Sequence, residues 1–179
     1  GMALGAGMFE YFAYSSDYSE TNNVGRGYDC ITSVSGVKTP LYDYVKNANN
    51  KALKFSKFIN AYDWQGATYS AGTTENENAA GFAMVDGLTL SSGETGCLTS
   101  YSSNYDALIG CFKQGDRDGY MVTNFTDPKN GRTTSVELTF EGCTKAAVYL
   151  NGKLVTVGLD NGTMTLDLLR GNAAFVMPF

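Results

Sequence analysis

The feature that most constrains this chain is a run of short, alternating segments between residues 105 and 179. In TSVELTF, for example, Val136, Leu138 and Phe140 fall on one face of an extended segment, and Glu137 and Thr139 fall on the other. The same region contains six more segments of this kind, namely ALIGCFK, GYMVTNF, AAVYL, KLVTVGL, TMTLDLL and AAFVMPF. About seven short strands at intervals of roughly 8–12 residues are typical of an antiparallel β-sandwich.

Turn residues separate these segments. Asn151-Gly152 is a strong hairpin signal, because both positions of a type I′ turn need a positive φ angle that Asn and Gly adopt readily. Residues 160–162 (Asp-Asn-Gly), 170–172 (Arg-Gly-Asn) and 114–119 (QGDRDG) supply three further turns. We therefore predict a mainly β fold, an antiparallel β-sandwich of about seven to eight strands over residues 105–179.

The N-terminal residues 1–62 follow a different pattern. The aromatic stretch GMFEYFAYSSD predicts a buried strand at about residues 8–14, and a polar loop follows it. Thr39 as N-cap and Pro40 at the first helical position predict a helix over residues 40–60. Its apolar face comprises Leu41, Val45, Ala48, Ala52, Phe55 and Ile59. Strand, loop and helix in this order make one β/α unit.

Residues 63–104 are rich in Gly, Ser, Thr and Asn, with short strand-like pieces such as GFAMV. We interpret them as a linker with irregular strands. The chain thus divides into a β/α unit (1–62), this linker (63–104) and the sandwich (105–179).

Composition excludes several functions and cofactors. The net charge is −5 and the 13 basic residues do not cluster, so a nucleic-acid surface is not expected. No apolar run reaches the roughly 18 residues that a membrane span needs. There is no histidine, which removes the commonest general base and metal ligand, and we expect no cofactor and no metal.

Four cysteines are widely spaced, at positions 30, 97, 111 and 143, without a CxxC pair. Cys97 and Cys111 are candidates for a disulfide across a loop if the protein is exported. The alternative is four reduced cysteines that act as small hydrophobic residues. No signal peptide is visible, and together with the missing disulfide framework this favours a cytoplasmic location.

The chain resembles the C-terminal end of a (β/α)8-barrel glycoside hydrolase of the β-galactosidase-like kind. LGAGMFEYFAY resembles the entry into the eighth barrel strand, and SGVKTPLYDYVKNANNKALKFSKFI resembles the closing helix. DGYMVTNFTDP, VYLNGK and LDLLRGNAAFVMPF resemble the small sandwich that often follows such barrels. The resemblance implies that residues 1–62 are the remnant of a β/α barrel.

Such enzymes cleave a glycosidic bond with two carboxyl groups, which in this family follow the fourth and seventh barrel strands. The resemblance places both upstream of Gly1, so no catalytic residue is assigned to this chain. Glu10 lies in the middle of the predicted strand, whereas catalytic carboxylates lie at the C-terminal ends of barrel strands. We interpret Glu10 as structural.

Tyr14 and Asp17 lie where the predicted strand would end, at the mouth of a barrel. In a complete enzyme, the Tyr14 ring would stack on a sugar ring and the Asp17 carboxylate would accept a hydrogen bond from a sugar hydroxyl. Both are therefore candidate substrate-binding residues. The alternative is an ordinary strand end followed by a polar loop. Five aromatic residues in the irregular zone are further candidate sugar platforms, although they equally suit packing: Tyr62, Trp64, Tyr69, Tyr101 and Tyr105.

Several turn residues have oxygen atoms that a calcium ion could use. Their spacing does not match an EF-hand loop, and turn chemistry explains them without a metal. They are Asp116, Asp118, Asp127, Asp160 and Asn161.

The leading hypothesis is a non-catalytic C-terminal portion of a glycoside hydrolase, which closes and braces the catalytic barrel. The alternative is a stand-alone carbohydrate-binding β-sandwich. Carbohydrate is the expected partner in the context of the full enzyme. The apolar sides of strand 8–14 and helix 40–60 also predict a homo-oligomer if the fragment folds alone.

Overall fold

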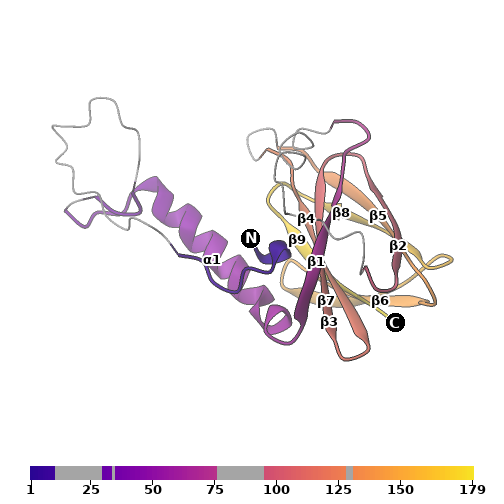
Figure 1. The fold of residues 1–179 in the computed structure, drawn as a ribbon. Coiled ribbons are helices and arrows are strands. Elements are labelled where there is room, and N and C mark those ends of the chain that lie inside the picture. Colours follow the sequence, from indigo (N-terminus) through magenta and orange to yellow (C-terminus); the bar gives the residue numbers. More distant parts are fainter. Residues whose placement is uncertain (11–29, 34, 76–94, 128–130) are drawn as a thin grey trace. The chain divides into compact units, whose positions relative to one another are not determined.

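The computed structural model describes residues 1–10, 30–33, 35–75, 95–127 and 131–179. They form two compact units, of which the first contains residues 1–7 and 58–179 and the second residues 8–57. The fold is mainly β, with antiparallel pairing throughout its two sheets (Figure 1). This confirms the predicted fold class, and the barrel remnant stays a prediction.

The two sheets belong to the first unit, here called the sandwich unit. One sheet has six strands in the order β1-β3-β4-β9-β6-β7, and the other has three in the order β2-β5-β8. In chain order the strands are β1 (Asp63–Ser70), β2 (Leu98–Ser103), β3 (Ala107–Gln114), β4 (Arg117–Asn124), β5 (Thr134–Phe140), β6 (Lys145–Leu150), β7 (Lys153–Gly158), β8 (Thr163–Leu168) and β9 (Ala173–Pro178).

The core lies between the two sheets. Val136, Leu138 and Phe140 of β5 are almost completely buried, as their alternation predicts. They pack in one cluster with side chains from the larger sheet, among them Ile109 and Val122. Because the cluster draws on both sheets, the sheets pack face to face as a sandwich. Figure 1 shows β2, β5 and β8 as a layer beside the sheet that carries β1, β3 and β4.

The predicted turns are confirmed. Asn151 and Gly152 have φ angles of 53° and 83°, as a type I′ turn requires, and they join Leu150 of β6 to Lys153 of β7. Asn161 and Gly162 have φ angles of 49° and 81° in the next turn. Glycine is required at position 162, because a Cβ atom there would lie 2.5 Å from a backbone oxygen.

β7 differs from its prediction. The alternation of KLVTVGL predicts that Val155 shares a core face with Val157 and Leu159, yet Leu154 and Val155 are both exposed. The reason is the position of β7, which is the last strand of the six-stranded sheet and pairs only with β6 within it. An edge strand has a neighbouring strand on one side only, so fewer side chains are available to cover its apolar residues.

β1 and β2 lie inside the segment 63–104 that we interpreted as a linker with irregular strands. β1 pairs with β3, and β2 pairs with β5, so both are part of the sheets. The remaining strand-like piece of that segment, GFAMV, lies outside the described residues.

An aromatic cluster covers the other face of the six-stranded sheet. Phe175 of β9 stacks on Phe58 with ring centroids 4.9 Å apart and touches Tyr62 and Phe112. Phe58 also contacts Tyr149 of β6. Phe58 belongs to the last turn of α1 (Pro40–Ile59), and from this residue on the chain belongs to the sandwich unit.

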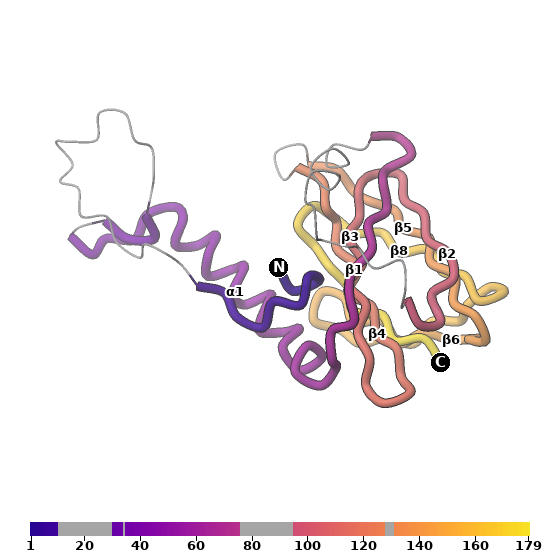
Figure 2. Tube along the Cα trace, viewed as in Figure 1, coloured from indigo at the N-terminus to yellow at the C-terminus, as the bar shows by residue number. Residues whose placement is uncertain are grey.

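The first seven residues also belong to the sandwich unit. They contain a short 3-10 turn, η1 (Met2–Leu4), in which Ala3 is buried. The Trp64 indole donates a hydrogen bond to the Ala3 carbonyl (3.2 Å), and a Cβ atom at Gly110 would lie 2.3 Å from the same oxygen. Figure 2 shows this N-terminal end beside β1.

The second unit, residues 8–57, contains most of α1, so the predicted helix over 40–60 is confirmed to within one residue. The Thr39 hydroxyl donates to the carbonyls of Cys30 (2.5 Å) and Ile31 (3.2 Å), which ties the helix start to the preceding segment. Among the described residues, no helix is long and apolar enough to cross a membrane.

The predicted strand at residues 8–14 is described only as far as residue 10. Residues 8–10 form no strand, and Met8, Phe9 and Glu10 are exposed, so this part is not the buried strand that the sequence predicts. Residues 11–14 lie outside the described residues.

Candidate functional site

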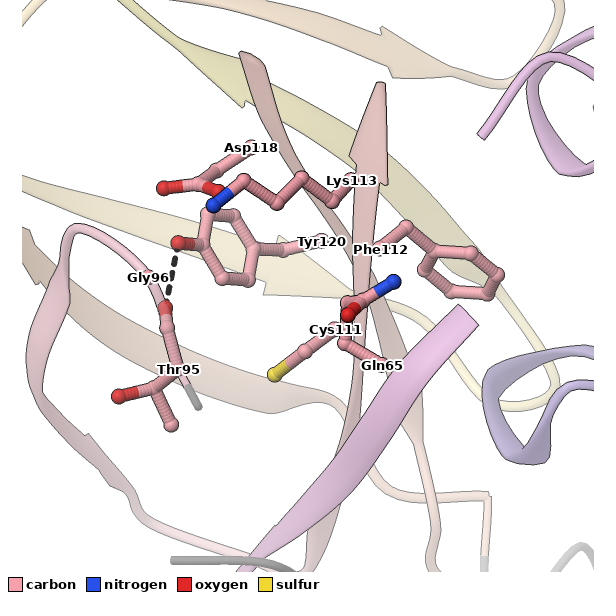
Figure 3. A pocket seen from close by; sticks show the side chains of 8 residues that line it. All are labelled: Gln65, Thr95, Gly96, Cys111, Phe112, Lys113, Asp118 and Tyr120. Carbon is pink, nitrogen blue, oxygen red and sulfur yellow. Dashed lines mark hydrogen bonds between the residues drawn. The ribbon is translucent and has the colours of Figure 1, made fainter. Parts of the chain in front are cut away.

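A polar cavity of about 370 Å³ lies at one end of the β3–β4 hairpin (Figure 3). Because it brings charged and amide side chains together, we consider it a candidate site. The residues that line it come from β1, β3, β4 and the segment before β2, and all belong to the sandwich unit: Gln65, Thr95, Gly96, Cys111, Phe112, Lys113, Asp118 and Tyr120.

The hairpin places the two charged residues opposite one another. Lys113 of β3 pairs with Asp118 of β4 across the turn at Gly115, and Cys111 pairs with Tyr120 two residues further along. Because side chains alternate along a strand, these four residues point to the same face of the sheet. Figure 3 shows the Lys113 and Asp118 side chains next to each other beyond the Tyr120 ring.

β1 contributes Gln65 through an irregularity. The β1–β3 register shifts between Trp64 and Gly66, so Gln65 is the extra residue of a β-bulge. A bulge redirects a side chain away from the strict alternation of the strand. It brings the Gln65 amide to the cavity, beside Cys111 in Figure 3.

Two side chains fix the segment before β2 as the cavity rim. The Tyr120 hydroxyl donates to the Thr95 carbonyl (2.6 Å) and accepts the N–H of Leu98 (3.1 Å). The Asp118 carboxylate accepts the N–H of Cys97 (2.8 Å). Gly96 has a φ angle of 57°, and a Cβ atom there would lie 2.3 Å from the Asp118 carboxylate, so only glycine fits.

Burial determines the protonation states of the rim. It raises the pKa of the Cys111 thiol to about 11 and that of the Cys97 thiol to about 12, and the nearby Asp118 carboxylate adds to both shifts. The pKa of Tyr120 is raised for the same first cause. At neutral pH these groups therefore hold their protons, and the two thiols are poor nucleophiles.

The chemistry of the cavity suits binding by hydrogen bonds. Lys113 supplies a cationic donor, Asp118 an anionic acceptor, and the Gln65 amide supplies both functions. The aromatic rings in the lining are not stacking platforms, because Phe112 and Tyr120 are only 2% and 1% exposed. A small polar ligand with several hydroxyl groups matches this set of donors and acceptors.

Two residues were predicted to bind substrate. Tyr14 and Asp17 lie outside the described residues, so their role stays a prediction. Glu10 is described and exposed, in the second unit. Within the described residues, no group of three or more His, Cys, Asp or Glu side chains is placed to hold a metal ion.

Four of the five candidate sugar platforms take part in internal contacts. Tyr62 packs on Phe175, and Tyr69 packs edge-on to Phe125. The remaining two are held by polar groups: the Tyr101 hydroxyl bonds Thr68, and the Arg132 guanidinium lies 4.8 Å above the Tyr105 ring.

Trp64 is the exception, with an exposed fraction of 44%. Its cross-strand partner is Phe112, and its ring lies against Gly5 of the N-terminal segment, 2.8 Å from where a Cβ atom of that glycine would be. It does not line the cavity.

Sequence reasoning missed Gln65 and Lys113, and it assigned Asp118 to a turn. Asp118 is instead the second residue of β4, and its carboxylate holds the rim. The sequence did contain a signal for this arrangement. Cys111 and Lys113 alternate before the hairpin turn, and Asp118 and Tyr120 alternate after it, which places all four side chains on one face.

Comparison of the chain with known protein families, characterised proteins and solved structures finds no match.

Proposed function

We propose that this chain is the non-catalytic C-terminal portion of a glycoside hydrolase, in which α1 and its preceding segment complete a catalytic barrel and the sandwich unit braces it. The supporting observation is the direct passage from α1 into the sandwich. Phe58 in the last helical turn stacks on Phe175 of β9, and β1 begins at Asp63. A closing helix followed directly by a small sandwich is the order of elements that the sequence resemblance implies.

The second unit supports the proposal through its exposed apolar side chains. Large hydrophobic residues are normally covered in a unit that functions alone. Five large hydrophobic residues among the described part of segment 8–57 are exposed, namely Met8 (78%), Phe9 (47%), Val37 (64%), Tyr44 (72%) and Leu53 (69%). In the proposed enzyme, neighbouring barrel elements cover them.

The proposal is tested by assaying the purified 179-residue protein with aryl glycosides. It predicts no hydrolysis above that of heat-inactivated protein, and no difference between wild type and Glu10→Gln. Hydrolysis by the wild type that disappears in Glu10→Gln would overturn the proposal, because it would assign a catalytic carboxylate to this chain.

The exposed apolar residues predict self-association when the barrel is absent. Light scattering over a range of protein concentrations should show dimers or larger species, and Leu53→Lys should shift them towards the monomer. Leu154→Lys, at an exposed position on the edge strand β7, is the matched control. A monomer at all concentrations for the wild type would contradict this part of the proposal.

The cavity favours a second candidate function, a sugar-binding sandwich. A neutral sugar offers hydroxyl groups to Asp118, Lys113 and Gln65 at once. Calorimetric titration with galactosides should give a binding heat, and Asp118→Asn should weaken binding about tenfold or more, since a hydrogen bond to a charged group contributes about 1.5–3 kcal/mol.

Asp167→Asn, at an exposed position of β8, is the control and should leave the affinity unchanged. No binding heat with any sugar tested would count against this second function. It would leave the bracing role untouched, because that role needs no ligand in the cavity.

A further inference from the structure

Two thiols lie close together beside the cavity rim. The Sγ atoms of Cys97 and Cys143 are 4.0 Å apart, although the residues are separated by 46 positions in the chain. Cys97 immediately precedes β2, and Cys143 lies between β5 and β6. Both side chains are partly exposed, whereas Cys111 is buried.

The backbone holds these two positions together without help from the sulfur atoms. β2 pairs with β5 so that Leu98 lies opposite Phe140. The N–H of Glu141 donates to the Cys97 carbonyl at 2.8 Å. The pairing of β2 with β5 is therefore what brings the two thiols close together.

The remaining distance can be closed by side-chain rotation. A disulfide has a sulfur–sulfur bond of about 2.05 Å, so the two sulfur atoms need to approach by about 2 Å. Rotation of one or both side chains about χ1 moves a sulfur atom on this scale, and the neighbouring turn at Gly142 is exposed.

We propose that Cys97 and Cys143 form an intramolecular disulfide that ties the cavity rim to the β5–β6 turn when the protein meets a small-molecule disulfide such as oxidised glutathione. The proposal replaces the Cys97–Cys111 pairing that sequence spacing suggested. It does not depend on the proposed function, because it concerns only the pairing of thiols within the sandwich unit.

The chemistry balances as two thiol–disulfide exchanges. The thiolate of Cys143 attacks one sulfur of the oxidised reagent, which forms a mixed disulfide and releases one reagent thiolate. Cys97 then loses its proton and attacks the Cys143 sulfur, which releases the second thiolate. The protein pair gives up two electrons and two protons, and the reagent disulfide is reduced to two thiols.

The order of attack follows from the state of Cys97. Burial raises the pKa of its thiol to about 12, so its thiolate fraction at neutral pH is small. The second step, in which Cys97 is the nucleophile, is then the slow one. Raising the pH from about 7 to about 9 should speed ring closure by a factor that approaches a hundred, as the thiolate fraction grows tenfold per pH unit.

The disulfide has a direct effect on the cavity. Thr95 and Gly96 line the cavity and immediately precede Cys97. In the reduced protein this segment is held by hydrogen bonds to Tyr120 and Asp118. In the oxidised protein a covalent link to the β5–β6 turn joins them, so the rim is fixed more firmly.

Peptide mapping by mass spectrometry tests the proposal. The full 179-residue protein is incubated with oxidised glutathione, its remaining thiols are blocked, and it is digested without reduction. We expect a Cys97–Cys143 linked peptide and a mass loss of two hydrogens in the intact monomer. A Cys97–Cys111 link, a link between two chains, or four free or glutathionylated thiols would overturn the proposal.

Two cysteine variants test which thiols form the link. Cys143→Ser should abolish the internal link and leave Cys97 as a free or mixed-disulfide thiol, whereas the control Cys30→Ser should keep it. Oxidised wild type should melt about 5–15 °C above its reduced form, because the link closes a long loop in the unfolded chain. Equal melting temperatures, with the link present by mass, would contradict the claim that it stabilises the rim.

Discussion

Leu138 in β5 and Leu53 in α1 are the same residue type in the two units of the molecule, with exposed fractions of 0% and 69%. The sandwich unit places its alternating apolar residues between two sheets. The segment 8–57 has one helix and no sheet among its described residues, so it has fewer surfaces on which to bury such residues. Apolar residues of the sandwich unit therefore form a core within the chain, whereas several of the second unit stay exposed, and we propose that a partner covers them.

The two leucines should differ most in the free energy of unfolding that their truncation costs. Leu138→Ala should lower the free energy of unfolding by about 2–5 kcal/mol, because it leaves a cavity between the sheets. Leu53→Ala should change it by less than about 0.5 kcal/mol, since the side chain is exposed. Urea denaturation followed by the fluorescence of Trp64, the single tryptophan, measures both. Similar costs for the two variants would contradict the division into a buried and an exposed leucine.

The second prediction compares two asparagines. Asn124 is buried, and its amide donates to the carbonyls of Arg132 (3.0 Å) and Leu168 (2.9 Å). Asn124→Ala leaves both carbonyls without this donor and should cost about 2–4 kcal/mol in the same urea experiment. Asn47→Ala, on the exposed side of α1, should leave stability unchanged or slightly higher, because alanine is the better helix former.

The third prediction concerns the first seven residues, which belong to the sandwich unit despite their distance in sequence. Gly110→Ala places a Cβ atom against the Ala3 backbone and should cost about 1–3 kcal/mol by displacing η1. Gly158→Ala, where nothing lies within 4 Å, should have little effect. In a protein lacking residues 1–7, Gly110→Ala should also have little effect. A full cost in that shortened protein would show that the strain has another source.

The smallest expected effect is a pH dependence of the free energy of unfolding that arises in the sandwich unit. The folded state raises the pKa of Cys97 from 9.0 to about 12 and also raises that of Tyr120, so it holds these protons more tightly than the unfolded chain. Their contribution to the free energy of unfolding is therefore fully present below about pH 9 and is lost as the pH rises towards 12.

Under reducing conditions, Cys97→Ser should make this fall shallower, and Cys30→Ser, in the second unit, should leave it unchanged. Urea midpoints at about pH 8, 9.5 and 11 measure the difference. The same slope in both variants would contradict the assignment of the pH dependence to the rim.

The strands from β3 to β9 were predictable because local signals agree with the fold. In β5 alternation and burial coincide, and the Asn151-Gly152 turn fixes the β6–β7 hairpin. β1 was not predictable, because Gly66, Ala67 and Thr68 are buried on both sides and show no alternation. Small residues buried on both faces of a strand resemble a flexible linker in sequence.

The candidate site was predictable in part only. Asp118 beside a turn has the same sequence pattern whether it is solvated or holds a backbone N–H. Its role depends on Cys97, which is 21 residues away in the chain and precedes a strand of the other sheet, so the two meet only because the sheets face each other. The approach of Cys97 to Cys143 depends instead on the register of β2 with β5. Such contacts between distant residues leave no local signal.

We propose that this chain completes and braces a glycoside hydrolase barrel, and sequencing of the reading frame upstream of the Gly1 codon tests this proposal. We expect the frame to continue through a (β/α)8 barrel, with one glutamate after the fourth strand and another after the seventh. A stop codon close upstream, or a frame that encodes a domain without such a barrel, would contradict it.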